Sequence, residues 1–189
     1  MRAHKPGQSA LLLLDVVDIL LRHAKVDYAV IGAIAASVHG AVRSSMDADV
    51  VLSLAAAEAG KLEANFKRAG FATKLSRGDV EDPIPALLEV CDALGNRVDL
   101  LIGLRGMERE AFARTIEVPF QGKTLRFIGK EDFIAMKVFA GGPQDIVDAS
   151  RALQAGGNSI DLALLERLAR GYGRHAASTF ERLIAGVQT

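Results

Sequence analysis

Three aspartates lie where their carboxylates could bind a metal ion. Asp47 and Asp49 stand two residues apart at the start of an apolar run, 50–52, and Asp99 lies within a second apolar run, 97–102. Because side chains alternate along a strand with period 2, Asp47 and Asp49 point to the same side of a sheet. An ionised carboxylate at the edge of an apolar core is costly unless a cation offsets its charge. The pattern predicts a divalent-metal site, and ligands that are all oxygens favour Mg²⁺.

Each aspartate also has an ordinary structural explanation. Asp47 could cap a loop, Asp49 could be a solvated residue at a strand end, and Asp99 could pair with Arg97 or another cation. The order of the three acids, two of them inside apolar runs, favours the metal site, because paired carboxylates clamp the metal ions of phosphoryl transfer.

The first two acids follow a strand, a helix and a loop. The apolar run 28–31 predicts the strand, and a stretch of small residues, 33–40, predicts the helix. Gly32 lies at the turn between them, where an open backbone is needed. A helix that begins near Ala33 would present free N–H groups to a phosphate. The polar loop 43–45 then leads to Asp47.

These motifs together resemble the nucleotidyltransferase superfamily, which has the DNA polymerase beta fold. The shared features are Gly32-Ala33, then Asp47-Ala48-Asp49-Val50, and Asp99 between apolar residues. Downstream, FIGKEDFIAMKVFAGGPQDIVDA resembles the corresponding segment of a small bacterial branch related to AbiEii-type toxins. In that branch a helix lysine precedes an Asp-x-x-Asp motif, here Lys137, Asp145 and Asp148. The resemblance covers about 27–153, most of the chain.

The resemblance implies a reaction and a cofactor. Asp47 and Asp49 would hold one Mg²⁺ on the triphosphate of an NTP, and with Asp99 they would hold a second. The second metal ion would lower the pKa of an acceptor hydroxyl, and Asp99 could take its proton. Attack at the α-phosphorus would then transfer a nucleoside monophosphate and release pyrophosphate.

The resemblance also implies a set of nucleotide-binding residues: Gly32, Ala33, Arg43, Ser44, Lys137 and Asp145. Most have a second interpretation. Arg43 either neutralises nearby carboxylates or binds a phosphate. Lys137 lies mid-helix among apolar residues, where a lysine either extends to solvent or meets a phosphate. Asp145 and Asp148 follow Pro143 at a helix start, where acids complement the helix dipole.

Two positions depart from the family pattern. Ala33 stands where Gly or Ser is usual, and Gln144 precedes Asp145 where the related toxins carry a basic residue. These departures support an alternative hypothesis, a binding module that keeps the fold without turnover. A third hypothesis is a structural protein in which the acids are incidental.

Composition narrows the possible partners. The 189 residues include 23 Lys+Arg and 23 Asp+Glu, so there is no global basic field for phosphates, and we expect no DNA partner. Arg167, Arg170 and Arg174 lie on one helical face, which is either solvated or a local RNA or partner contact. One cysteine excludes an internal disulfide. No stretch approaches the roughly 20 apolar residues of a membrane span, so we expect a cytoplasmic protein.

Hydrophobic periodicity and turn residues predict the remaining elements. Ser9 is the expected N-cap of the first helix. The predicted helices are 11–23, 55–69, a short one at 106–114, and then 130–139, 144–154, 161–172 and 175–185. The predicted strands are 71–75, 87–92 and 97–102, followed by a hairpin over 115–128.

The sequence thus predicts an α/β (α+β) protein. A nucleotidyltransferase core with a mixed β-sheet and packed helices would occupy 1–129, and a helical portion, 130–189, would pack on it. The expected acceptor is a hydroxyl of RNA, for example tRNA, of a protein or of a small molecule. The AbiEii-like resemblance further implies a possible toxin role with an antitoxin partner.

Overall fold

The computed structural model describes residues 4–43 and 46–187. The chain forms two compact units, each built from segments that are separate in sequence. The first unit comprises 1–34, 44–105 and 117–126, and the second comprises 35–43, 106–116 and 127–189.

Contacts that are distant in sequence explain why the second unit takes in two early segments. His39 Nε2 lies 2.8 Å from the carbonyl oxygen of Ile128, and the guanidinium of Arg114 donates to the Asp132 carboxylate at 2.7 Å. Both contacts lie within the second unit, and the Arg114–Asp132 contact joins residues on the two sides of residue 129.

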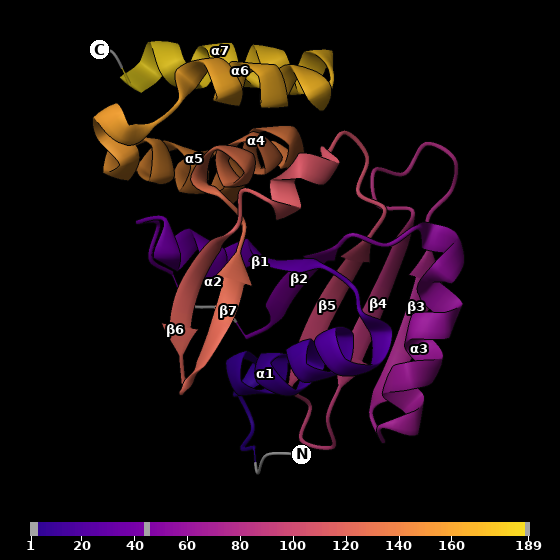
Figure 1. Cartoon of the computed structure of the whole chain (residues 1–189). Coiled ribbons are helices and arrows are strands. Elements are labelled where there is room, and N and C mark those ends of the chain that lie inside the picture. Colours follow the sequence, from indigo (N-terminus) through magenta and orange to yellow (C-terminus); the bar gives the residue numbers. More distant parts are fainter. Residues whose placement is uncertain (1–3, 44–45, 188–189) are drawn as a thin grey trace. The chain divides into compact units, whose positions relative to one another are not determined.

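A seven-stranded mixed sheet forms most of the first unit, in the order β3-β4-β5-β2-β1-β7-β6 (Figure 1). Strands β2 and β5 pair parallel, whereas β1–β2, β3–β4 and β4–β5 pair antiparallel. The strands are β1 (Tyr28–Ile31), β2 (Ala48–Leu52), β3 (Ala72–Arg77), β4 (Ala86–Cys91), β5 (Arg97–Ile102), β6 (Ile116–Phe120) and β7 (Lys123–Phe127).

One face of this sheet is buried under two helices. α1 (Ser9–Ile19) packs on β5 and β2, and α3 (Ala59–Arg68) packs on β3 and β4. Alternate residues of the central strands are fully buried, for example Leu88, Leu100 and Val50 at 0% exposure. The intervening residues of β4 and β5 are only half-buried. Because strand side chains alternate, β4 and β5 present their second face as a more open surface.

The expected N-cap role of Ser9 is wrong. Gln8 is the N-cap of α1, and Ser9 is already helical. The Ser9 hydroxyl instead donates to the carbonyl oxygen of Met46 at 2.6 Å and accepts from the backbone N–H of Arg97 at 3.0 Å. Its side chain ties the helix to β5 and to the segment before β2. After Ile19 the helix continues as a π-helical turn, η1 (Leu20–Ala24), which ends at Lys25 with a φ of 52°.

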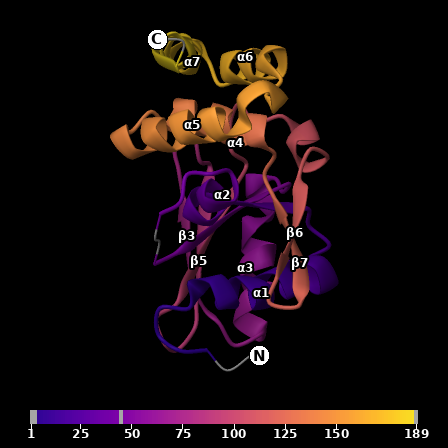
Figure 2. The same ribbon diagram turned by 90° about the vertical axis from the view of Figure 1, so that its left-hand side faces the viewer.

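Four helices make up most of the second unit: α4 (Lys130–Ala140), α5 (Pro143–Gly156), α6 (Leu162–Gly171) and α7 (Arg174–Val187). α4 contacts the other three, and α6 packs on α7. Figure 2 shows α6 and α7 as one layer above α4 and α5. Glycines end or separate these helices, as at Gly141, which has a φ of 68°.

The observed elements confirm the predicted fold class, a mixed sheet with packed helices and a C-terminal helical portion. The predicted hairpin is also present, because Gln121 and Gly122 both adopt the positive φ that a tight turn requires. α2 (Gly32–Val38) follows β1 directly. Within the described ranges, no helix is long and apolar enough to cross a bilayer.

Candidate functional site

The open face of the sheet brings two of the predicted acids into register. Asp49 of β2 stands directly opposite Asp99 of β5, and Asp99 stands directly opposite Glu89 of β4. Lys74 of β3 completes the row beside Glu89. Neighbouring strands lie about 4.8 Å apart, so these side chains are immediate neighbours on one face. The carboxylates of Asp49, Asp99 and Glu89 therefore form a row across three strands. The row follows from the strand register and from the alternation of side chains along each strand.

Arg97 supplies the positive charge beside this row. Its Nη2 lies 2.6 Å from Oδ2 of Asp47, and its Nε lies 3.2 Å from Oδ1 of Asp99. The second contact is an ion pair without hydrogen-bond geometry: within the described residues, neither this Nε nor this Oδ1 makes a hydrogen bond, although both are buried. Asp99 thus has a buried oxygen with a charged neighbour but no hydrogen bond, which is costly for a carboxylate.

Burial and neighbouring charge raise the pKa of Asp99 to about 6. Desolvation is the largest cause, because burial disfavours the charged form. The positive charge of Arg97 opposes the rise, whereas the negative charges of Asp49 and Asp47 add to it. At neutral pH the Asp99 carboxyl is mostly ionised and remains able to accept a proton.

Gly32 is required by two features of its position. Its φ is 64°, a left-handed conformation that favours glycine, and a Cβ placed there would lie 2.0 Å from Oδ2 of Asp49. The backbone at the start of α2 therefore lies against the Asp49 carboxylate. Ala33 follows with its side chain buried at 2% exposure. The predicted strand-to-helix turn is present, and only glycine fits it.

The acids suit a divalent cation by donor type, although not in their present arrangement. Across the described parts of the chain, no group of three His, Cys, Asp or Glu residues is placed to hold a metal ion. Arg97 pairs with both Asp47 and Asp99 instead. The donors are carboxylate oxygens, which Mg²⁺ prefers, and the buried Oδ1 of Asp99 lacks a hydrogen bond. The donor atoms therefore suit Mg²⁺ in type, and Arg97 lies against two of the three acids.

A second charged cluster lies within the second unit, where α4 meets α5. Lys137 of α4 is 9% exposed, and its Nζ lies 2.7 Å from Oδ1 of Asp145 and 3.1 Å from Oδ2 of Asp148. Asp148 is fully buried and also receives contacts from Arg43 Nε at 3.2 Å and Gln144 Nε2 at 2.9 Å. Two cations and two carboxylates thus form a balanced network.

This network decides some of the alternatives that the sequence left open. Lys137 does not extend to solvent, and Asp148 is more than a helix-dipole residue, because its carboxylate is buried among charged partners. Burial alone would raise the pKa of Asp148, but hydrogen bonds from Gln144 and Lys137 outweigh it and hold that pKa below its ordinary value. Arg43 pairs with this acid.

The predicted site residues divide between the two units. Gly32, Ala33 and the three aspartates belong to the first unit, and Arg43, Lys137 and Asp145 belong to the second. Ser44 lies outside the described residues. Each unit therefore carries a part of the predicted set.

Sequence reasoning missed Glu89 as a member of the acid row. The predicted hairpin could have shown its position, because a turn over 92–96 places residue 89 opposite residue 99 when β4 and β5 are antiparallel. The role of Ser9 in positioning the Arg97 backbone had no signal in sequence, because the two residues are 88 positions apart.

Comparison with known proteins gives matches in structure but none in sequence. No family model and no curated protein matches the chain. The solution structure of the antibiotic-resistance factor ANT(2'')-Ia matches with a TM-score of 0.60 at 13% identity, covering 97% of this chain and 96% of that one. A crystal structure of ANT(2")-Ia in complex with adenylyl-2"-tobramycin matches with a TM-score of 0.59 at 15% identity, covering 86% and 98%.

An antigenic nucleotidyltransferase-like protein from Paracoccidioides brasiliensis matches with a TM-score of 0.54 at 13% identity, covering 97% of this chain and 91% of that one. At such low identities the matches establish the fold. The chain therefore has a nucleotidyltransferase-like fold, in agreement with the resemblance seen in its sequence. These matches do not show that the chain belongs to the narrower AbiEii-type branch.

Proposed function

We propose that this protein is a Mg²⁺-dependent nucleotidyltransferase that moves a nucleoside monophosphate from an NTP to an acceptor hydroxyl. One observation carries the proposal. Asp49 and Asp99 stand in register on the open face of a nucleotidyltransferase-like sheet, with Gly32 packed against the Asp49 carboxylate. A row of carboxylates that repel one another is costly to keep without a cation, which supports a binding role for them.

The carboxylates of Asp47, Asp49 and Asp99 would hold the metal ions. When bound, Mg²⁺ neutralises charge on the triphosphate and makes the acceptor hydroxyl easier to deprotonate. Asp47 and Asp49 would orient the triphosphate through the ion they hold. The backbone at Gly32 lies against the Asp49 carboxylate, so the glycine would let a phosphate held through Asp49 approach the main chain.

Asp99 would accept the proton of the acceptor hydroxyl. A pKa of about 6 makes it a stronger base than an ordinary aspartate while it stays mostly ionised at neutral pH. The acceptor oxygen would then form a bond to the α-phosphorus, and the bond from that phosphorus to the bridging oxygen would break. Pyrophosphate leaves with the electron pair of the broken bond.

Lys137, Arg43 and Asp145 are proposed as further nucleotide-binding residues. The two cations are already paired with carboxylates of their own unit, so a phosphate would have to compete with Asp145 and Asp148. Such an exchange is feasible for Asp145, whose side chain is 28% exposed, and costly for the fully buried Asp148.

The candidate acceptors are a small molecule, an RNA and a protein. The structure of ANT(2")-Ia with adenylyl-2"-tobramycin holds an adenylylated small molecule, which supports a small-molecule acceptor for this fold. The AbiEii-like sequence motifs instead support a tRNA or protein acceptor and a toxin with an antitoxin partner.

A specific observation favours the alternative of a non-catalytic binding module. Arg97 occupies the acid cluster, and the described residues offer no ready group of three metal ligands. A module that had lost its metal would keep Arg97 as the permanent partner of Asp47 and Asp99.

A thermal-shift titration distinguishes the nucleotidyltransferase from the non-catalytic binding module. We expect one or more of the four NTPs to raise the melting temperature in the presence of Mg²⁺, because ligand at a hundredfold excess over Kd stabilises by about 2.7 kcal/mol. The shift should disappear without Mg²⁺ and in the Asp47→Asn/Asp49→Asn variant. Asp27→Asn is the matched control, because this acid is 64% exposed and pairs with Arg126 of the same unit.

Transfer itself is then measured with α-labelled NTP and candidate acceptors, namely an aminoglycoside, bulk tRNA and the protein's own hydroxyls. Label on one of them that depends on Asp49 would establish the enzyme and identify the acceptor class. A folded wild type that shows neither an NTP shift nor labelling would support the binding module instead.

A further inference from the structure

Arg97 is held in the acid cluster from several sides. Its backbone belongs to β5, and its N–H donates to the hydroxyl of Ser9, which is 4% exposed. Its guanidinium spans Asp47 and Asp99, with N–O distances of 2.6 and 3.2 Å. The negative charges of Asp99 and Asp47 raise the pKa of Arg97 above the already high value of a guanidinium, so its side chain is positively charged at neutral pH.

The guanidinium therefore neutralises the same carboxylates that a divalent ion would use. Both cations cannot occupy this position, because two positive centres at about 4 Å repel as strongly as an ion pair attracts. The contact with Asp99 is also imperfect, since the Nε and Oδ1 atoms lack hydrogen-bond geometry. A metal ion that bound Oδ1 directly would satisfy an oxygen that Arg97 leaves unsatisfied.

We propose that Arg97 is a built-in counter-ion of the metal site, which a divalent cation must displace before it can bind. The inference rests on the proposed function, because it assumes that Asp47, Asp49 and Asp99 are metal ligands. Arg97 is a positioning residue: it keeps the two acids together in the metal-free protein and weakens metal affinity by competition.

The surrounding structure allows the guanidinium to leave without unfolding the strand. The backbone of Arg97 stays fixed by its pairing with Cys91 and by Ser9, while its side chain is 38% exposed. Glu89 is a further carboxylate on the same face, and its charge already acts on Arg97. The released side chain can thus turn toward Glu89 or toward solvent.

Mn²⁺ binding to the full chain tests this inference, with the free ion measured by electron paramagnetic resonance. We expect Arg97→Gln to bind Mn²⁺ at least about tenfold more tightly than the wild type, which corresponds to one broken ion pair of about 1.4 kcal/mol. Arg97→Lys, which keeps the charge but loses the two-point contact, should fall between them. The matched control is Arg126→Gln, which removes another strand arginine paired with an aspartate of the same unit.

The metal-free proteins give a second readout. After chelation of divalent ions, Arg97→Gln should melt at a lower temperature than the wild type, because Asp47 and Asp99 lose the guanidinium that pairs with both, and saturating Mn²⁺ should close this gap. Circular dichroism at room temperature establishes that the variant is folded before the affinities are compared.

The outcomes separate this inference from the proposed function. Asp49-dependent Mn²⁺ binding in the wild type that is equal to or tighter than in Arg97→Gln would overturn the counter-ion role and leave the metal site intact. Mn²⁺ binding that does not change in Asp49→Asn, or none in any variant, would overturn the metal site itself. Binding in Arg97→Gln alone would support the counter-ion role in its strongest form.

Discussion

At the scale of single residues, Asp99 has the most informative environment. Its neighbours across the strands are Asp49 and Glu89, and its nearest cation is Arg97. Burial and these carboxylates make ionisation of Asp99 unfavourable, so part of the folding free energy is given up to keep the acid ionised. Such a cost is expected where residues are arranged for chemistry rather than for stability.

We expect the stability of the metal-free protein to fall as pH rises because of Asp99. Its pKa is about 6 in the folded protein against an ordinary 3.8, so between these values the folded state holds a proton that the unfolded chain has released. The free energy of unfolding therefore decreases as pH rises through this range, by about 3 kcal/mol in total. Above the folded pKa the loss is complete.

Urea unfolding of the wild type and Asp99→Asn in chelator, at several values from about pH 4 to about pH 7, measures this effect. The wild type should lose stability relative to the variant as pH rises, because the variant has no carboxyl to ionise. A difference between the two proteins that stays constant over this range would show that Asp99 titrates normally. Asp27→Asn serves as the surface control.

At the scale of elements, the junction of α4 and α5 depends on buried charge. Lys137 lies on α4, and its two carboxylate partners lie on the first turns of α5, after the Gly141-Gly142 break. A Cβ at position 142 would lie 2.9 Å from Oδ2 of Asp145, so the glycine lets this carboxylate approach the backbone. The break and the ion pairs together fix α5 against α4.

We expect Lys137→Met to lower the free energy of unfolding by about 3–5 kcal/mol, because it removes a partner of the fully buried Asp148. The double variant Lys137→Met/Asp148→Asn should lose less than the sum of the two single variants, because each single variant already breaks the Lys137–Asp148 pair. A double-mutant cycle in urea measures both effects.

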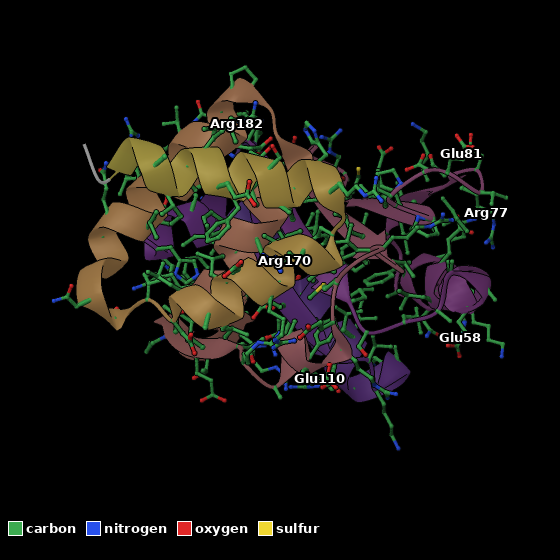
Figure 3. All side chains as sticks on the ribbon, turned by 90° about the horizontal axis from the view of Figure 1, so that it is seen from above. Glu58, Arg77, Glu81, Glu110, Arg170 and Arg182 are labelled. Atoms are coloured by element: carbon green, nitrogen blue, oxygen red, sulfur yellow. The ribbon has the colours of Figure 1, made fainter. Side chains whose placement is uncertain are left out.

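Arg170→Met is the control for this cycle. Arg170 lies on α6 (Figure 3), and it pairs with Glu166 one turn away while its side chain is 66% exposed. Loss of this surface pair should change stability by less than about 1 kcal/mol. If Lys137→Met cost no more than this control, the α4–α5 network would be a surface-like pair, and any loss of NTP binding in the variant could be assigned to lost phosphate contact alone.

At the scale of the whole molecule, the balance of charges limits how strongly the chain can bind a polyanion such as RNA. Lys+Arg and Asp+Glu both number 23. Within the second unit, two arginines of the predicted basic face are already paired, Arg167 with Glu108 and Arg170 with Glu166. The face that could have contacted RNA is therefore partly neutralised by its own carboxylates.

We expect tRNA to bind the full chain weakly, with a Kd above about 1 µM at roughly 0.15 M salt, because few phosphates can be neutralised. Fluorescence anisotropy with labelled tRNA over a range of salt concentrations measures both the affinity and its salt dependence. A shallow slope of log K against log salt would agree with this charge balance. A steep slope with tight binding would instead reveal a local basic patch and make RNA the leading acceptor.

The sequence by itself determined the elements and the identity of the acids. Period 2 and period 3.6 patterns, together with glycine breaks, predicted the strands and the four C-terminal helices, since burial of apolar side chains acts locally along each element. The Asp-x-Asp motif at the start of β2 and the acid Asp99 on β5 could be recognised for the same reason. Gly32 could also be recognised from the sequence, because the turn from strand to helix at this position requires a glycine.

Only the tertiary structure decided which charges meet. The in-register row that contains Glu89, the Ser9 contact that positions Arg97, and the burial of Asp148 all join residues that lie far apart in sequence or on different elements. Ion pairs form wherever folding places opposite charges together, and a sequence without a known register does not specify those distances. The sequence therefore predicted three acids that need a cation, and the structure places Arg97 against two of them, Asp47 and Asp99.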